Sequence, residues 1–391
     1  MKVRVLRFIL ILLMLCLFYL PSIAFANGAA FDGKGKDRSG NKHGKLVKKT
    51  AAMKRAELAA ARLRAARAAE ARQRRAEFES SLKSKAVSNI ANDTIAGQDP
   101  KVRAAAISAL GDHVGTVVVM EPQTGRVLAI VNEGMAIRDA IKPCSVIKLV
   151  TGIAGLKAGK IDADGKIVGI SNSRTLEYAI AKSDNPFFRQ LGERVGNDKF
   201  IEAAKELGLG SKTGINLPEE SPGVLPYGSK NSNQYWKGDG TELTAIQAAV
   251  MVATIVNGGK KVRPIIPASP EVPITTVSTQ ANLPIETFKG MIPGMYGSAT
   301  YGTAKVLAKS NPFLGAASKT GTCLDRSHSV YTGIGLNASV APINNPKYVV
   351  VVITHGQGQK GIQASLIARE IYKVLIPPPF ETTTQVAQSA K

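Results

Sequence analysis

The sequence predicts an α+β fold in which one antiparallel sheet is assembled from both ends of a single domain and flanked by helices. Two β-branched runs, residues 115–121 and 126–132, are joined by a Pro/Gly turn, which is typical of a hairpin. Strand patterns return over residues 317–354, and residues 361–376 follow as an amphipathic helix. The segments between these strands predict an all-helical subdomain over residues 145–159, 175–182, 186–195, 199–207 and 241–257.

The N-terminus has the pattern of an export signal. Residues 1–7 carry three positive charges, residues 8–20 are uniformly apolar, and Ala24-Phe25-Ala26 has the small residues that a signal peptidase accepts. The apolar run is shorter than the roughly 20 residues that span a bilayer, yet residues 21–26 extend it. We therefore expect residues 1–26 to be a signal peptide or an N-terminal membrane anchor, and the protein to be periplasmic or on the outer face of the cytoplasmic membrane.

A strongly basic arm follows the signal. Residues 27–90 contain 17 Lys and Arg against 6 Asp and Glu, half of the chain's net charge of +22. Residues 27–47 are rich in Gly, Lys and Asp and predict a disordered linker. Residues 48–90 favour a helix by propensity but have no strong apolar stripe. The helix is either a solvated spacer or attaches to anionic wall polymers or phospholipid headgroups. Export argues against a nucleic-acid partner.

Three short motifs supply the chemistry of a serine acyl transferase. Together they provide a hydroxyl nucleophile, a neighbouring amine, a second hydroxyl and a second cation. In chain order they are Ser145-Val146-Ile147-Lys148, Ser183-Asp184-Asn185 and Lys319-Thr320-Gly321-Thr322.

The same short patterns also occur by chance, so context decides which of them carry function. Ser39 and Ser80 each have a Lys three positions later, but both lie in the basic arm. Lys212 begins a second Lys-Thr-Gly in a Gly-rich loop after a helix. Ser145, in contrast, follows two predicted strands and opens an apolar helix, and Lys319 begins a predicted strand. The sequence therefore favours the ordered trio as the functional set.

Residues 98–377 resemble the transpeptidase domain of penicillin-binding proteins, in the serine D,D-peptidase and β-lactamase-like superfamily, in a form without a glycosyltransferase domain. Besides the trio, the resemblance rests on the hairpin of residues 117–130, the loop of residues 209–226, and the helix of residues 241–263 with its Asn257-Gly258-Gly259 exit. It implies a β-lactamase/transpeptidase-like fold. Residues 378–391 are then expected to be a flexible tail.

The residues suggest distinct roles in one reaction. Lys148 shares a helix face with Ser145 and, with its pKa lowered by burial and a second cation at Lys319, accepts the proton of Ser145. Ser183 hands a proton to the leaving amine, and Asn185 orients Lys148. By resemblance, the backbone N–H groups of Ser145 and Thr322 form the oxyanion hole. The resemblance also implies that the substrate carboxylate is received by Lys319, Thr320, Gly321 and Thr322.

The resemblance also implies a disulfide. Some serine carbapenemases join the two positions that correspond to Cys144 and Cys323, which flank Ser145 and Thr322. We expect this bond to form after export, with two free thiols as the alternative. The four His residues have no ligand spacing, so neither a metal nor another cofactor is expected.

The expected function is that of a serine D,D-transpeptidase or D,D-carboxypeptidase that acts on D-Ala-D-Ala stem peptides of peptidoglycan through an acyl-enzyme and is inhibited by β-lactams. One alternative is a serine β-lactamase, which needs an additional base for deacylation. Another is a β-lactam or muropeptide sensor, or a scaffold whose basic helix recruits wall-synthesis proteins.

Overall fold

The computed structural model describes residues 51–171, 173–325 and 332–379. The expected signal or anchor, the linker of residues 27–47 and the tail from residue 380 onward lie outside these residues. Contacts divide the chain into two units, residues 1–61 and 62–391. In the first, residues 51–61 are described and form the start of helix α2 (Ala51–Ala91). Of the helices in the described ranges, none combines the length and apolar character needed to cross a membrane.

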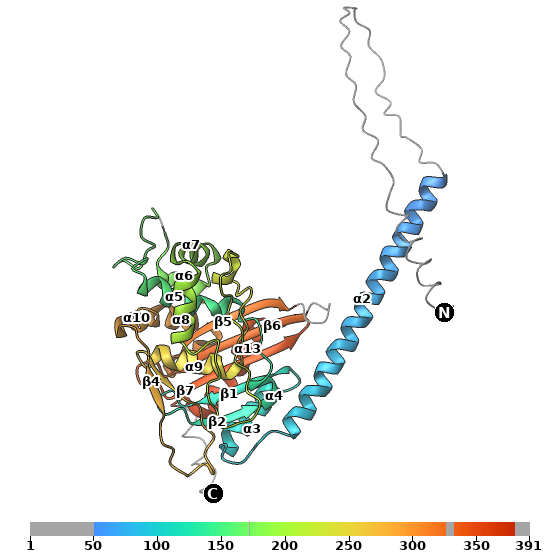
Figure 1. Ribbon diagram of the computed structural model, residues 1–391. Helices are drawn as coiled ribbons and strands as arrows, with labels where there is room; N and C mark the ends of the chain where they lie inside the picture. Colours follow the sequence, from blue (N-terminus) through green and yellow to red (C-terminus); the bar gives the residue numbers. More distant parts are fainter. Residues whose placement is uncertain (1–50, 172, 326–331, 380–391) are drawn as a thin grey trace, which may run out of the picture. The chain divides into compact units, whose positions relative to one another are not determined.

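The central sheet is antiparallel throughout and has the strand order β2-β1-β7-β6-β5. β1 pairs with β7 along its whole length, so the first and last strands of the domain are neighbours. The predicted sheet assembled from both ends of the domain is thereby confirmed (Figure 1). The strands are β1 (Val114–Met120), β2 (Val127–Val131), β5 (Ala317–Asp325), β6 (Thr332–Ala341) and β7 (Tyr348–Gly356).

Both faces of the sheet are covered, which explains why β1 is apolar at almost every position. Val117 and Val119 face a core formed with α3 (Pro100–Leu110) and α13 (Gly361–Leu375). Val118 and Met120, at the alternate positions, face the larger core that contains α9 (Ala245–Val256). Side chains that alternate along one strand therefore anchor helices on two opposite faces.

The helical subdomain is built around α5, which packs against α7 and α8. Gly155 permits this packing, because a Cβ there would lie 2.8 Å from Leu191 Cδ1 of α7. A smaller hairpin of β3 and β4 follows α9. The remaining elements are α4 (Glu133–Ile137), η2 (Cys144–Ile147), α5 (Lys148–Lys157), α6 (Leu176–Lys182), α7 (Asn185–Val195), α8 (Asn197–Glu206), η3 (Ser232–Tyr235), β3 (Lys260–Val262), β4 (Ser278–Gln280), α10 (Ile285–Lys289), α11 (Ile292–Thr300), α12 (Val306–Ser310) and η4 (Pro312–Leu314).

Candidate active site

Ser145 lies in a short 3₁₀ helix, η2, rather than in the α-helix that its sequence pattern predicts. The α-helix α5 begins three residues later, at Lys148. Residues i and i+3 of a 3₁₀ turn eclipse one another, so Ser145 and Lys148 still leave the chain on the same side. Cys144, just before Ser145, has a φ of 51°, a left-handed conformation that is strained for a non-glycine residue. Buried Val146 and Ile147 anchor the turn in the core.

Lys148 is fully buried and joins α5 to the turn between α6 and α7. Its Nζ donates hydrogen bonds to the carbonyl oxygen of Ser183 at 2.7 Å and to the Ser183 hydroxyl at 3.0 Å. It also donates to Asn185 Oδ1. Within the described residues, all three hydrogen bonds of Lys148 Nζ go to residues of the second motif. None of the three is to Ser145 Oγ.

The turn that carries the second motif is fixed by its own backbone. Ser183 ends α6 in the left-handed region, with a φ of 57°. Asp184 then begins α7, where its Oδ1 accepts the Phe187 amide at 2.9 Å. Asp184 also forms an ion pair with Arg174, which holds its carboxylate at the start of α7.

Lys319 of β5 meets the same hydroxyl from the other side. Its side chain is fully buried, and its Nζ lies 3.0 Å from Ser183 Oγ and 2.9 Å from the carbonyl oxygen of Thr320. The Ser183 hydroxyl therefore lies between two amines, Lys148 and Lys319, that come from different parts of the chain.

Burial lowers the pKa of both lysines. For Lys148 the pKa falls from 10.5 to about 7, and the negative charge of Asp184 opposes this fall. The pKa of Lys319 is also lowered well below its usual value, first by burial and then by the positive charge of Lys148. Two ammonium groups around one hydroxyl repel each other, so the cluster favours one neutral amine near neutral pH.

The strand β5 lies directly against the η2 turn. A Cβ at Gly321 would lie 3.0 Å from the Pro143 carbonyl oxygen and 3.3 Å from Cys144 Cβ, which leaves no room for a side chain. Cys144 and Cys323 form a disulfide with a Cα–Cα distance of 5.6 Å, the pair that the resemblance implies. Ser145 and Thr322 are thus neighbours of the two bonded cysteines.

The hydroxyls of the third motif differ in their surroundings. Thr320 is buried, and its Oγ1 donates to Thr303 Oγ1 at 2.7 Å. Thr322 is exposed, and its Oγ1 accepts the Gly361 amide, at the start of α13, at 2.9 Å. Thr303 could not be predicted from the sequence, because it lies outside the strand and belongs to no motif.

A cavity of about 660 Å³ opens at Ser145 and is also lined by Asn185 and Thr322. A loop with Trp236 and Asp239 also lines the cavity, and it was not predicted from the sequence because it has no motif and no regular period. In this loop Asp239 forms an ion pair with Lys142, three residues before Ser145. The other lining residues are Cys144, Lys237, Cys323 and Leu324.

The second Lys-Thr-Gly has a structural role. The Glu220 carboxylate accepts the amide and the hydroxyl of Thr213, both at 2.6 Å, and the Gly214 amide at 3.0 Å. These bonds fix the loop after α8. Of the other early matches, Ser80 and Lys83 lie on helix α2, and Ser39 lies outside the described residues.

Comparison with known proteins identifies the domain. A family model described as the penicillin binding protein transpeptidase domain matches residues 115–373, more than half of the chain. The penicillin-binding protein PbpB of Mycolicibacterium smegmatis is 30% identical over 205 residues, which are 42% of this chain and 32% of that protein. The peptidoglycan D,D-transpeptidase MrdA of Salmonella typhimurium is 27% identical over 246 residues, 52% of this chain and 38% of that protein. The chain thus spans well under half the length of these relatives.

Solved structures show the same fold. Pseudomonas aeruginosa PBP2, in complex with WCK 5153, superposes with a TM-score of 0.62 at 20% identity, over 73% of this chain and 79% of that one. A peptidoglycan glycosyltransferase from Burkholderia ambifaria gives a TM-score of 0.61 at 20% identity, over 73% of this chain and 98% of that one. At this identity the likeness establishes the architecture alone.

Proposed function

Since the chain belongs to the penicillin-binding protein transpeptidase domain family, we propose that it is a serine D,D-peptidase, a transpeptidase or carboxypeptidase that acts on the D-Ala-D-Ala end of peptidoglycan stem peptides. One observation carries the proposal: a single hydroxyl, that of Ser183, lies 3.0 Å from the amines of both Lys148 and Lys319. This arrangement can move a proton between a nucleophile and a leaving group without any histidine.

In the acylation step Ser145 Oγ attacks the carbonyl carbon of the penultimate D-Ala, and its proton passes to the neutral amine of Lys148. The pKa of about 7 makes that amine available near neutral pH. Collapse of the tetrahedral intermediate forms the ester and breaks the C–N bond. The proton returns from Lys148 through the Ser183 hydroxyl to the departing D-Ala amine. An acceptor amine or water then attacks the ester.

Residues of β5 are proposed to bind the negative charges of the substrate, namely the oxyanion and the terminal carboxylate. The backbone N–H groups of Ser145 and Thr322 are proposed to bind the oxyanion, and loss of one such donor typically raises the barrier by about 2.7–4 kcal/mol. The Cys144–Cys323 disulfide supports this role, because it ties the two backbones together. Lys319 supplies positive charge for the substrate carboxylate, alongside Thr320 and Thr322, and Gly321 keeps the strand close enough to do so.

A β-lactamase is the less favoured alternative, since it needs a base that activates the deacylating water. Among the described residues that line the cavity, the acidic one is Asp239, and its carboxylate is ion-paired with Lys142. Glu219 pairs with Arg138, and Glu220 holds the loop after α8. None of these groups is free to activate water beside Ser145, which favours a long-lived acyl-enzyme with β-lactams.

The protein is proposed to act outside the cytoplasm, because its N-terminus has the pattern of an export signal and its relatives include a peptidoglycan D,D-transpeptidase. The exposed, basic helix α2 is proposed to attach the enzyme to an anionic wall polymer or phospholipid surface, or to recruit wall-synthesis proteins. Deletion of residues 51–75 should then release the protein from cell envelopes at low salt while penicillin labelling is retained. Equal retention of the full and shortened chains would argue for a passive spacer.

The central experiment is labelling with a fluorescent penicillin, followed by assay on a D-Ala-D-Ala pentapeptide with and without an acceptor amine. We expect stoichiometric labelling of the wild type, none of Ser145→Ala, and D-Ala release that depends on Ser145. Cross-linked product distinguishes a transpeptidase from a carboxypeptidase. Labelling without peptide cleavage would instead indicate a sensor, and rapid multiple turnover of nitrocefin a β-lactamase.

A further inference from the structure

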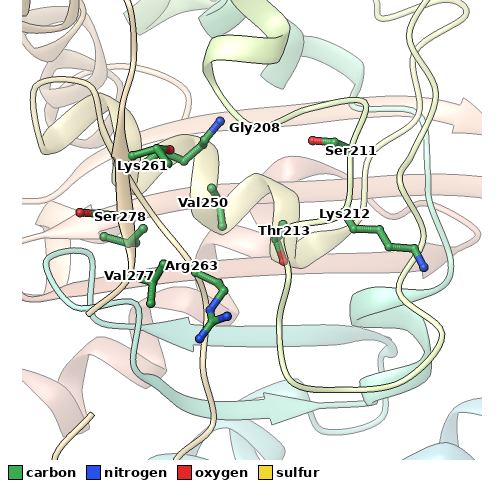
Figure 2. A pocket seen from close by; sticks show the side chains of 11 residues that line it. Gly208, Ser211, Lys212, Thr213, Val250, Lys261, Arg263, Val277 and Ser278 are labelled. Atoms are coloured by element: carbon green, nitrogen blue, oxygen red, sulfur yellow. The ribbon is translucent and has the colours of Figure 1, made fainter. Parts of the chain in front are cut away.

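Charged side chains line more than one cavity of the molecule. A cavity of about 300 Å³ borders α9 and takes no part in the proposed reaction (Figure 2). Figure 2 shows the charged ends of Lys261 and Arg263 extending in different directions there, so this cavity has no common charged centre. In the cavity at Ser145, by contrast, two opposite charges meet, because Asp239 is ion-paired with Lys142.

The Lys142–Asp239 pair lies close to the nucleophile in the chain and is largely enclosed. Lys142 is three residues before Ser145, and its ammonium group contacts Asp239 Oδ1. The two side chains are 22% and 23% exposed. Asn231 Nδ2 donates to the other carboxylate oxygen of Asp239 at 3.4 Å. Burial raises the pKa of Asp239, but Lys142 outweighs burial and holds this pKa below its usual value, so the carboxylate is charged at neutral pH.

Backbone contacts bring the loop of Asp239 close to the same turn. Ile141 and Leu243 exchange two backbone hydrogen bonds, each of 2.8 Å. A Cβ at Gly238 would lie 2.8 Å from Pro143 Cγ and 3.4 Å from the Cys144 nitrogen. The loop therefore packs directly on the start of η2.

The loop is anchored on both sides. Thr151 of α5 donates to the carbonyl oxygen of Tyr235 at 2.6 Å, just before the loop. Thr244, just after the loop, caps α9 by accepting the Gln247 amide at 3.2 Å. A loop that is fixed at both ends can hold the η2 turn in place.

The η2 turn needs support because Cys144 has a left-handed backbone. Such a conformation in a non-glycine residue persists where the surrounding contacts hold it. The disulfide to Cys323 and the close contact at Gly321 join the turn to β5. The Lys142–Asp239 pair joins the turn to the loop, so the turn is held by two separate segments.

We propose that Asp239 is a positioning residue for Ser145: through Lys142 it holds the η2 turn, and with it the nucleophile, in the geometry that acylation needs. This role presupposes the proposed acylation of Ser145. Asp239 acts on the turn and not on the substrate, so its loss slows the attack without weakening the first encounter with a β-lactam. A misplacement of about 1 Å can lower the rate of a reaction about 100-fold.

Stopped-flow acylation of the full chain by a fluorescent penicillin separates these two effects. The dependence on penicillin concentration gives a non-covalent Kd and a limiting rate. In Asp239→Asn we expect the limiting rate to fall about 10- to 100-fold and the Kd to stay unchanged. Glu202→Gln is the matched control, because it removes the partner of Lys157 in an ion pair between α5 and α8 with the same change in charge. The control should acylate like the wild type.

Variants of Lys142 test whether the two charges act as a unit. Lys142→Met should slow acylation as much as Asp239→Asn does, and the double variant should be no slower than either. Lys142→Arg keeps the cation and should acylate close to the wild-type rate. Two outcomes would overturn the proposal. Effects that multiply in the double variant would show that the charges act independently, and a raised Kd with an unchanged limiting rate would show that Asp239 binds the substrate.

Amide hydrogen exchange tests the same role without catalysis. We expect residues 141–148 to exchange faster in Asp239→Asn than in the wild type or in Glu202→Gln, because the η2 turn opens more often. Unchanged exchange over these residues would show that Asp239 does not hold the turn. If penicillin does not acylate the wild type, the proposed function fails, and the exchange measurement still decides whether Asp239 holds the turn.

Discussion

The amine of Lys148 lies 3.0 Å from the hydroxyl of Ser183, although the two residues are 35 positions apart in the chain. This contact joins the first helix of the subdomain to the turn between α6 and α7. The contact gives a proton that leaves Lys148 a direct route to Ser183. Lys319 approaches the same hydroxyl at 3.0 Å.

Replacement of the buried amine should slow acylation while the cavity remains. In Lys148→Met we expect the rate of penicillin labelling to fall by about 10²- to 10⁴-fold, the usual contribution of a positioned base. Stopped-flow or gel-based labelling measures the rate. Lys199→Met on the exposed face of α8 is the control and should label like the wild type. Normal labelling of Lys148→Met in a folded protein would contradict the assignment.

The acylation rate should rise with pH through about 7 and then level off, because Lys148 accepts a proton only when its amine is neutral. Stability should follow the same direction. A lysine in the unfolded chain has a pKa of about 10.4, so between pH 7 and 10 the unfolded state binds more protons than the folded state. The free energy of unfolding contributed by this group therefore increases with pH over that window. A labelling rate that is flat from pH 5 to 9 would argue against Lys148 as the base.

Asp184 should tune this pH profile from a distance. Its negative charge raises the pKa of Lys148, so Asp184→Asn is expected to move the acid limb of the rate profile to lower pH. Asparagine caps helices as well as aspartate does, so α7 should be retained. Arg174→Gln, which removes the partner of Asp184, should move the limb the other way, and by less because that guanidinium is 60% exposed. Identical pH profiles for all three proteins would show that Asp184 does not influence the pKa of Lys148.

Loss of the disulfide should cost both stability and rate. The bond closes a separation of 179 residues, for which the chain-entropy model gives about 5 kcal/mol, with measured losses usually about 2–5 kcal/mol. We expect Cys144→Ser with Cys323→Ser to lower the unfolding midpoint in urea and to slow labelling, because the turn at Ser145 loses its tie to β5. Alkylation of the non-reduced wild type followed by mass measurement provides the check. Modification of both Cys144 and Cys323 in that sample would show that the bond does not form in solution.

A single methyl group at Gly321 should push β5 away from the η2 turn that carries Ser145. In Gly321→Ala the new Cβ would lie 3.0 Å from the Pro143 carbonyl oxygen, so β5 or the η2 turn must move. We expect labelling to slow by at least about tenfold with a loss of about 1–3 kcal/mol in unfolding free energy, as is typical of overpacking. Rate and denaturation measurements on one preparation test this. Wild-type labelling by a destabilised variant would show that the spacing of strand and turn does not control acylation.

Local pattern was sufficient for much of the fold. The hairpin of β1 and β2 follows from β-branched runs around a Pro/Gly turn, and α13 follows from its amphipathic period. Helix α3 was missed, because its pattern of Ala and charged residues resembles that of the basic arm before it. The start of α5 was placed too early, since the tight 3₁₀ turn at Ser145 has the same apolar residues as a helix.

By itself, the sequence determined which groups are present and which of them are local neighbours: the spacing of Ser145 and Lys148, the strand that begins near Lys319, and the apolar runs that must be buried. Tertiary structure alone decided that Ser183 lies between two buried amines, that a loop with Trp236 and Asp239 lines the cavity, and that Lys142 pairs with Asp239. The physical reason is the distance along the chain over which each effect acts. Helical and strand periods act over a few residues, whereas desolvation of an amine depends on segments that fold together from distant parts of the chain.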